Sequence, residues 1–325
     1  MKEYIVSADD NGIKLIKYLG KVLCQANTSF IYKMLRKKNI LLNDKKAAGN
    51  EILKASDSIK LYFSDDTFNK FSDGHSVPFE NSDFAGSNKL PPVVYEDHNI
   101  IILNKPAGML SQKAKESDIS LNEICISYLM SKGEISSESI RMFKPSVINR
   151  LDRNTMGLIV FAKTYVAANI LSKALKDRKI HKYYKCVVVG VVDKEVILDG
   201  FLQKDEKTNT VTIRPEDKAS GEDSKIYTCI RPIHSNGKYT LLDVLLITGK
   251  THQIRAHLAY NGHPIVGDYK YGNAIVNKEV MREYKINSQM LISYKLEMPE
   301  LPDELSDLSN RTFEIDIPKK FKDIV

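Results

Sequence analysis

The 325-residue sequence lacks tryptophan, has only four cysteines and contains no long apolar run. A membrane-spanning helix needs about 20 mainly apolar residues in succession, and a secretory signal needs an apolar stretch where this chain has MKEYIVSADDNG. The cysteines are too few for a disulfide scaffold and too scattered for structural zinc. They are Cys24, Cys125, Cys186 and Cys229. We therefore expect a cytoplasmic protein, not associated with a membrane, with buried or incidental thiols.

Positive charge is in excess and is distributed unevenly. The net charge of +7 fits a protein that binds a polyanion. Residues 1–63 carry 12 Lys/Arg against 6 Asp/Glu, whereas residues 64–90 carry 2 against 5 and are rich in Ser, Asp, Asn and Gly. The apolar fraction of 42% is ordinary for a globular protein, and the length favours two domains. We predict a small basic domain at 1–63, a flexible acidic linker at 64–90 and a large domain at 91–325.

The N-terminal region has the pattern of an amphipathic helix followed by a hairpin. Ser29 can cap a helix whose apolar stripe includes Ile31 and Leu35, and Asn39 suits its end. Residues 40–45 then predict a short strand entering a turn. The basic side chains of this helix are candidates for phosphate contacts, although a basic helix alone also fits a solvated surface. They are Lys33, Arg36 and Lys37.

Several segments of the large region predict scaffold. The apolar run 100–103 indicates a buried strand, which ends at the turn NKPAG, residues 104–108. Ser120 begins the capping-box pattern SLNE of one helix, and Thr164 can cap another. Residues 183–189 and 238–248 indicate further strands.

A charged segment, NRLDRNTMG at residues 149–157, precedes another apolar strand. Its Asp152 lies between Arg150 and Arg153, whose charges favour the ionised carboxylate. An ionised carboxylate held in place suits nucleophilic or base chemistry. On this segment alone, a structural salt bridge in a turn also fits.

A second polar segment, GKTHQIRAHL, occupies residues 249–258 after a predicted strand. A glycine turn that enters a basic helix forms a natural anion-binding corner. His252 and His257 lie on different helix faces with no acidic residue between them, so we expect no metal site. The nucleotide phosphate-loop pattern is not met either, because Val244 occupies the position of its first glycine.

These segments together resemble the RluA/RluC/RluD family of pseudouridine synthases over nearly the whole chain. The family's elements occur in order: NKPAG at 104–108, Arg150-Leu151-Asp152 with Thr155 and Gly157, then Thr248-Gly249, HQIR at 252–255, GHP at 262–264 and Gly267-Asp268. Residues 10–63 resemble an S4 RNA-binding domain, which completes the RluC/RluD arrangement.

The resemblance implies roles for individual residues. Asp152 matches the catalytic aspartate, Arg255 the arginine that pairs with it, and Tyr184 the active-site tyrosine. Arg150 matches a residue that fills the space left by the flipped base. The implied fold class is α+β, with a small S4-like domain and a catalytic domain built on a mixed, mainly antiparallel sheet.

The implied reaction isomerises specific uridines to pseudouridine in RNA, with 23S ribosomal RNA as the expected partner and no cofactor or metal. The N1–C1′ bond breaks, the uracil turns, and C5 bonds to C1′. Two departures from the family pattern concern residues without a role in bond chemistry: Asn149 replaces a usual His and Met156 a usual Ser. We expect activity to be retained, and we expect a monomer.

Two alternatives remain open. The chain could be a non-catalytic RNA-binding or ribosome-assembly protein on a synthase scaffold, a reading that the two departures favour. It could also be a synthase of the same family that modifies transfer RNA, because no motif here reports the target sequence.

Overall fold

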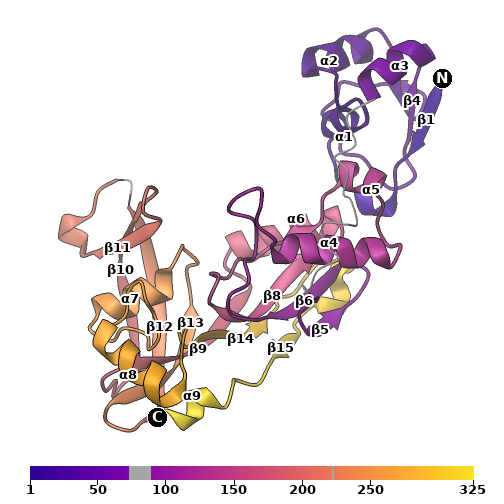
Figure 1. The fold of residues 1–325 in the computed structure, drawn as a ribbon. Coiled ribbons are helices and arrows are strands. Elements are labelled where there is room, and N and C mark those ends of the chain that lie inside the picture. Colours follow the sequence, from indigo (N-terminus) through magenta and orange to yellow (C-terminus); the bar gives the residue numbers. More distant parts are fainter. Residues whose placement is uncertain (73–88, 222) are drawn as a thin grey trace.

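The computed structural model describes residues 1–72, 89–221 and 223–325, arranged around two sheets (Figure 1). A four-stranded sheet belongs to the N-terminal residues, and an eleven-stranded sheet begins at Val93. No helix in these ranges is long and apolar enough to cross a membrane.

The N-terminal unit, residues 1–72, packs three helices against an antiparallel sheet of order β1-β4-β2-β3. Its strands are β1 (Lys2–Ile5), β2 (Ile40–Leu42), β3 (Lys45–Lys46) and β4 (Ser58–Leu61). Its helices are α1 (Leu15–Val22), α2 (Thr28–Arg36) and α3 (Asp65–Ser72). Leu19, Ile31 and Leu61 are among the buried residues of its own core.

Three expectations for this unit are wrong in detail. Asn27, not Ser29, caps α2, because its side chain accepts a hydrogen bond from the Phe30 N–H at 2.8 Å. The left-handed residue after α2 is Lys38, with φ +61°, rather than Asn39. The segment expected to be a linker begins with α3, whose phenylalanines pack against the N-terminal core. The remainder of that segment, residues 73–88, lies outside the described residues.

The large sheet has the order β11-β10-β12-β13-β9-β14-β8-β6-β5, with β15 paired to β14 and β7 to β8. Its strands are β5 (Val93–Glu96), β6 (Ile100–Lys105), β7 (Ser146–Val147), β8 (Met156–Ala162), β9 (His181–Val189), β10 (Val196–Asp205), β11 (Thr210–Arg214), β12 (Ser224–Ser235), β13 (Tyr239–Leu246), β14 (Leu291–Glu297) and β15 (Thr312–Glu314). Among the strands of this sheet in the described residues, only β14 and β8 pair in parallel. The expectation of a mixed, mainly antiparallel sheet is thus confirmed.

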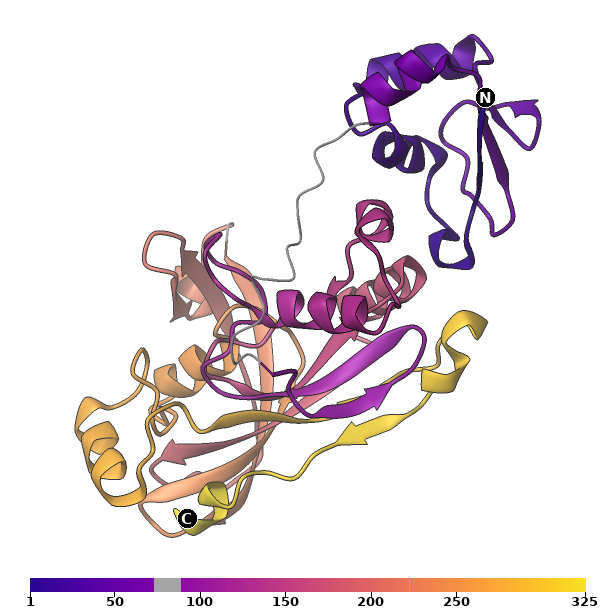
Figure 2. The same cartoon turned by 45° about the vertical axis from the view of Figure 1, so that its right-hand side comes forward.

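Helices cover both faces of this sheet (Figures 1 and 2). They are α4 (Leu121–Ser131), α5 (Ser137–Met142), α6 (Tyr165–Lys176), α7 (Gln253–Tyr260), α8 (Ala274–Tyr284) and α9 (Lys320–Asp323). Ile101 and Leu103 of β6 pack on the α4 side, while Ile100 and Ile102 pack on the α6 side. Burial on both faces explains why this strand is apolar without alternation.

The N-terminal unit contacts the large unit beside α5 and α6. The Lys21 ammonium donates to the Met142 carbonyl and lies 5.8 Å from the centre of the Tyr165 ring. Asp9 Oδ1 lies 2.9 Å from His98 Nε2. Through Lys21, α1 lies against the end of α5 and the start of α6, whereas Asp9 contacts the turn between β5 and β6.

Candidate active site

A cleft of about 1060 Å³ opens between the β7–β8 loop, the end of α6 and the start of α7. Nine Lys/Arg residues line it, and Asp152 is the one carboxylate among the described lining residues. The basic residues are Lys113, Arg150, Arg153, Lys176, Arg178, Lys182, Lys204, Lys250 and Arg255. A concave wall lined mainly by positive charges suits a polyanion. The electrostatic field of these charges is concentrated inside the cleft.

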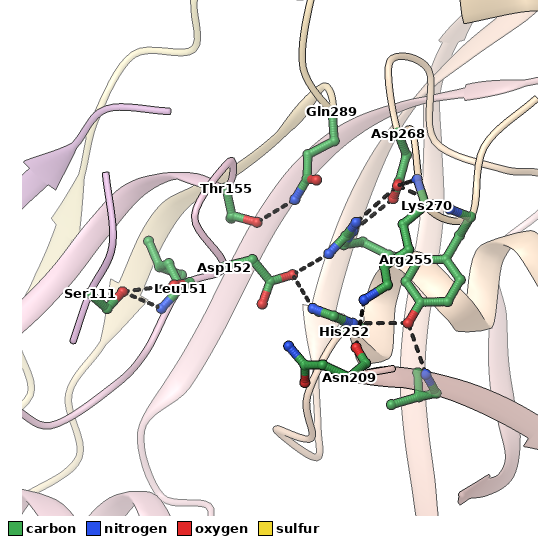
Figure 3. A network of polar contacts seen from close by, with 12 residues as sticks. Ser111, Leu151, Asp152, Thr155, Asn209, His252, Arg255, Asp268, Lys270 and Gln289 are labelled. Carbon is green, nitrogen blue, oxygen red and sulfur yellow. Dashed lines mark hydrogen bonds and ion pairs between the residues drawn. The ribbon is translucent and has the colours of Figure 1, made fainter. Parts of the chain in front are cut away.

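The loop that carries Asp152 is anchored on both sides of the carboxylate (Figure 3). Ser111 Oγ donates to the Leu151 carbonyl at 2.7 Å and accepts from the Leu151 N–H at 3.1 Å. Beyond Asp152, Gln289 Nε2 donates to Thr155 Oγ1 at 2.8 Å. Since Leu151 before Asp152 and Thr155 after it are both held by residues from other parts of the chain, the loop that carries the carboxylate has little freedom to move.

A buried lysine also holds the Asp152 loop through hydrogen bonds to backbone carbonyls. Lys105 Nζ donates to the carbonyls of Pro106, Met109 and Arg153 at 2.8–3.0 Å. Burial lowers the pKa of Lys105 to about 7, against the opposing charge of Asp152. This lysine belongs to the NKPAG turn, so the turn and the Asp152 loop form one hydrogen-bonded unit.

Gly157 closes the loop where β8 meets β14. Its φ is +108°, and a Cβ at this position would lie 2.1 Å from the Ser293 carbonyl oxygen. Any side chain here would push the two strands apart, so the close approach requires glycine.

Arg255, on α7, bridges two carboxylates. Its Nη1 donates to Asp152 Oδ2 at 2.9 Å, while Nε and Nη2 donate to Asp268 at 2.7 and 2.9 Å. Asp268 is fully buried, whereas the Asp152 side chain is 27% exposed at the cleft. The fork of Arg255 is therefore fixed from behind by Asp268 and presents one N–H to Asp152.

The pKa shifts agree with this geometry. Burial acts to raise the pKa of Asp268, but the bonds from Arg255 and from backbone N–H groups outweigh it and lower the pKa. Burial acts to lower the pKa of Arg255, but Asp268 and then Asp152 outweigh it and raise the pKa. Both groups stay charged, so Asp152 has a permanent cation beside it.

A histidine also faces Asp152. His252 Nε2 lies 3.9 Å from Asp152 Oδ2, and His252 Nδ1 lies 2.9 Å from the Tyr271 hydroxyl. That hydroxyl also accepts from the Val211 N–H at 2.9 Å, so Tyr271 holds the ring of His252 in the cleft. Burial lowers the pKa of His252 in spite of the Asp152 charge, which favours the neutral ring.

The other predicted residues divide between the two units. Tyr184, on β9, lines the cleft and also belongs to the core, and burial raises its pKa, which keeps the phenol neutral. Arg150 is exposed in the cleft wall. The three predicted contacts on α2 and its C-cap are all exposed in the N-terminal unit, outside the residues that line the cleft: Lys33, Arg36 and Lys37.

The two departures from the family pattern occupy structural positions. Asn149 Oδ1 accepts from the Val160 N–H at 2.7 Å, and its amide donates to the Leu158 carbonyl at 3.4 Å. Met156 begins β8 and packs against a core cluster. Asn149 thus satisfies backbone groups of β8 and leaves the contacts of Asp152 intact.

Comparison with known proteins decides the family. The RNA pseudouridylate synthase family matches residues 99–260. An uncharacterized RNA pseudouridine synthase of Mycoplasma capricolum subsp. capricolum is 30% identical over 319 residues, which is 96% of this chain and 96% of that protein. The chain belongs to the RNA pseudouridine synthases.

One further relative agrees with this family, and one solved structure shares the fold of this synthase. The ribosomal large subunit pseudouridine synthase C of Rickettsia bellii is 31% identical, over 80% of this chain and 83% of that protein. The structure of human RNA pseudouridylate synthase domain containing 4 covers 71% of this chain and 90% of its own, with 20% identity and a TM-score of 0.57, which shows a shared fold. The synthase is an isomerase that converts uridine in RNA to pseudouridine.

Several residues of the site had no role in the sequence-based prediction. His252 lies in the motif HQIR and Asp268 in Gly267-Asp268. Each is a polar residue that follows a glycine turn, and this position could have indicated a site residue. Ser111 and Gln289 lie in segments without a motif, and their contacts are visible only in the folded chain.

Proposed function

We propose that this synthase modifies 23S ribosomal RNA and that Asp152 is its catalytic carboxylate. The observation that carries the proposal is the position of Asp152: it is the one carboxylate among the described residues of a basic cleft, and Arg255 holds it by a 2.9 Å bond. The relative from Rickettsia bellii is named for the ribosomal large subunit, which supports the same target and a cytoplasmic location.

The proposed chemistry uses few groups. A uridine turned out of the RNA enters the cleft, and the ionised Asp152 either attacks C1′ or removes the 2′ proton. Arg255 keeps the carboxylate charged and directed at the sugar. The neutral phenol of Tyr184 packs on the base and takes part in proton transfer at C5.

The target is tested with purified protein and two unmodified transcripts, 23S ribosomal RNA and a pool of transfer RNAs. We expect pseudouridine in the first only. Conversion of transfer RNA alone would leave the chemistry standing and replace the target, and conversion of neither would favour a non-catalytic RNA-binding protein.

Arg150 is proposed to fill the gap that the extruded uridine leaves. It is exposed in the cleft wall, two residues before Asp152. Arg150→Ala is expected to slow modification of folded RNA about 10-fold or more, because gap filling offsets part of an unstacking cost of a few kcal/mol. A single-stranded oligonucleotide should be affected less. Equal losses on both substrates would contradict the role.

The N-terminal unit is proposed to be an S4-like RNA-binding domain. Residues 1–63 carry a net charge of +6, and exposed basic residues gather on α2 and on the neighbouring β2–β3 hairpin. The helix end contributes Lys33, Arg36 and Lys37, and the hairpin contributes Lys45 and Lys46.

Changing Lys33, Arg36 and Lys37 together to Gln should weaken RNA binding and lower the slope of log affinity against log salt by about 2 to 3, since fewer counterions are released. The matched control changes three exposed lysines of the large unit to Gln: Lys278, Lys319 and Lys322. The same slope in both variants would remove the RNA-binding interpretation of α2.

A further inference from the structure

Lys182 lies two residues before Tyr184 on β9, and both side chains line the cleft. Side chains at this spacing project from the same face of a strand, with Cα atoms about 7 Å apart. The aliphatic part of Lys182 lies in an apolar recess with Leu175, Ile180 and Leu296. A Cβ built on Gly249 would be 2.9 Å from Lys182 Nζ, so the ammonium lies against the turn before α7.

The ammonium of Lys182 has no partner within the described chain. No hydrogen bond or ion pair between described residues reaches it, and burial lowers its pKa without an opposing acidic group. A half-buried cation is costly unless an anion compensates it. The apolar recess and the adjacent turn hold this cation at the cleft without supplying that anion.

The neighbouring groups on this wall add positive charge. Lys176, Arg178 and Lys250 line the same cleft and are exposed. The nearby carboxylate of Asp177 is paired with Lys173 at 2.5 Å, and Asp152 is paired with Arg255. The anion that these cations face must therefore come from the substrate.

We propose that Lys182, with Lys176, Arg178 and Lys250, forms a subsite for a phosphodiester of the RNA strand adjacent to the uridine that reacts at Asp152. The inference rests on the proposed function, because it takes RNA as the occupant. The short distance along β9 from Lys182 to Tyr184 assigns the subsite to a linkage next to the target nucleotide rather than to a distant helix. A semi-buried lysine gives a stronger contact than the exposed lysines of the rim.

The first test compares Lys182→Met with Lys179→Met, which removes the same charge from an exposed lysine that does not line the cleft. Lys182→Met should raise the half-saturating concentration of unmodified 23S transcript about 10-fold, the loss expected for one charge-assisted hydrogen bond. It should lower the salt slope of binding by about 1. The maximal single-turnover rate should change less than about 3-fold, and Lys182→Arg should restore binding.

The second test locates the phosphate. In an unmodified stem-loop that contains the target uridine, each phosphodiester beside that uridine is replaced in turn by an uncharged methylphosphonate. At one linkage the replacement should lower the affinity of the wild-type protein, whereas the affinity of Lys182→Met, which already lacks the contact, should not fall further. The subsite would be overturned if both proteins lost the same affinity at every linkage. It would also be overturned if Lys182→Met had the same RNA affinity and the same salt slope of binding as Lys179→Met. Absence of pseudouridine with wild-type protein would overturn the proposed function instead, since the binding comparison does not need turnover.

Discussion

Arg255→Met is expected to reduce the single-turnover rate of pseudouridine formation by about 10²- to 10³-fold. The substitution keeps an unbranched side chain, although a shorter one, and removes the N–H whose hydrogen bond Asp152 accepts at 2.9 Å. Asp152 would then lose the cation that fixes its direction and its charge, while the backbone of its loop stays anchored through Ser111. We expect RNA affinity to change much less than the rate.

The same substitution also destabilises the fold, so stability must be measured beside activity. Asp268 is fully buried and would lose two bonds from Arg255, and an uncompensated buried charge costs about 3–5 kcal/mol. Arg255→Lys is the control, because it restores a positive charge but cannot bridge both carboxylates with the planar fork. It should recover much of the thermal stability and little of the rate.

A double-mutant cycle tests whether Arg255 acts through Asp152. Combining Arg255→Met with Asp152→Asn should lower the rate no further than Asp152→Asn alone, because groups that act as a unit lose their effect as a unit. Rate losses that multiply would contradict the pairing and leave Asp152 as an independent group.

The sequence predicted the centre of the site because its signals are local. The charged loop around Asp152 precedes an apolar strand, and HQIR follows a glycine turn, so both segments could be placed at strand ends. The structure brings Asp152 and Arg255 together across 103 positions of sequence, as the resemblance implied. The capping residues Ser120 and Thr164 were predicted for the same reason, since a cap is read from four adjacent residues.

The supports of the site could not be predicted, because each depends on a tertiary contact. Gln289 reaches Thr155 across 134 positions, and Ser111 reaches Leu151 across 40. The helix α3 was not predicted, because its two phenylalanines are partly buried only by packing against the N-terminal core, a contact that the local sequence does not show. The strands β10 to β12 were not predicted either, and they form hairpins with their sequence neighbours, β10 with β11 and β12 with β13, as well as the β10–β12 pair.

Asp152→Asn is expected to lower the rate by at least about 10⁴-fold, the order of loss when a group that acts in bond making is removed. The amide has nearly the same size and keeps an oxygen for Arg255, so the cleft should retain its shape. Nucleophilic attack and proton removal both need the carboxylate charge, so the expectation holds for either route. RNA affinity should stay within about 3-fold, because Asp152 contributes no attraction to a polyanion.

The most direct measurement is pseudouridine formed in unmodified 23S ribosomal RNA under single-turnover conditions, with wild-type protein and Asp152→Asn side by side and RNA binding measured for each. Wild-type protein should convert a defined uridine, and Asp152→Asn should bind the RNA within about 3-fold of the wild-type affinity and form product at least about 10⁴-fold more slowly. Wild-type turnover by Asp152→Asn would contradict the assignment of Asp152 as the catalytic carboxylate.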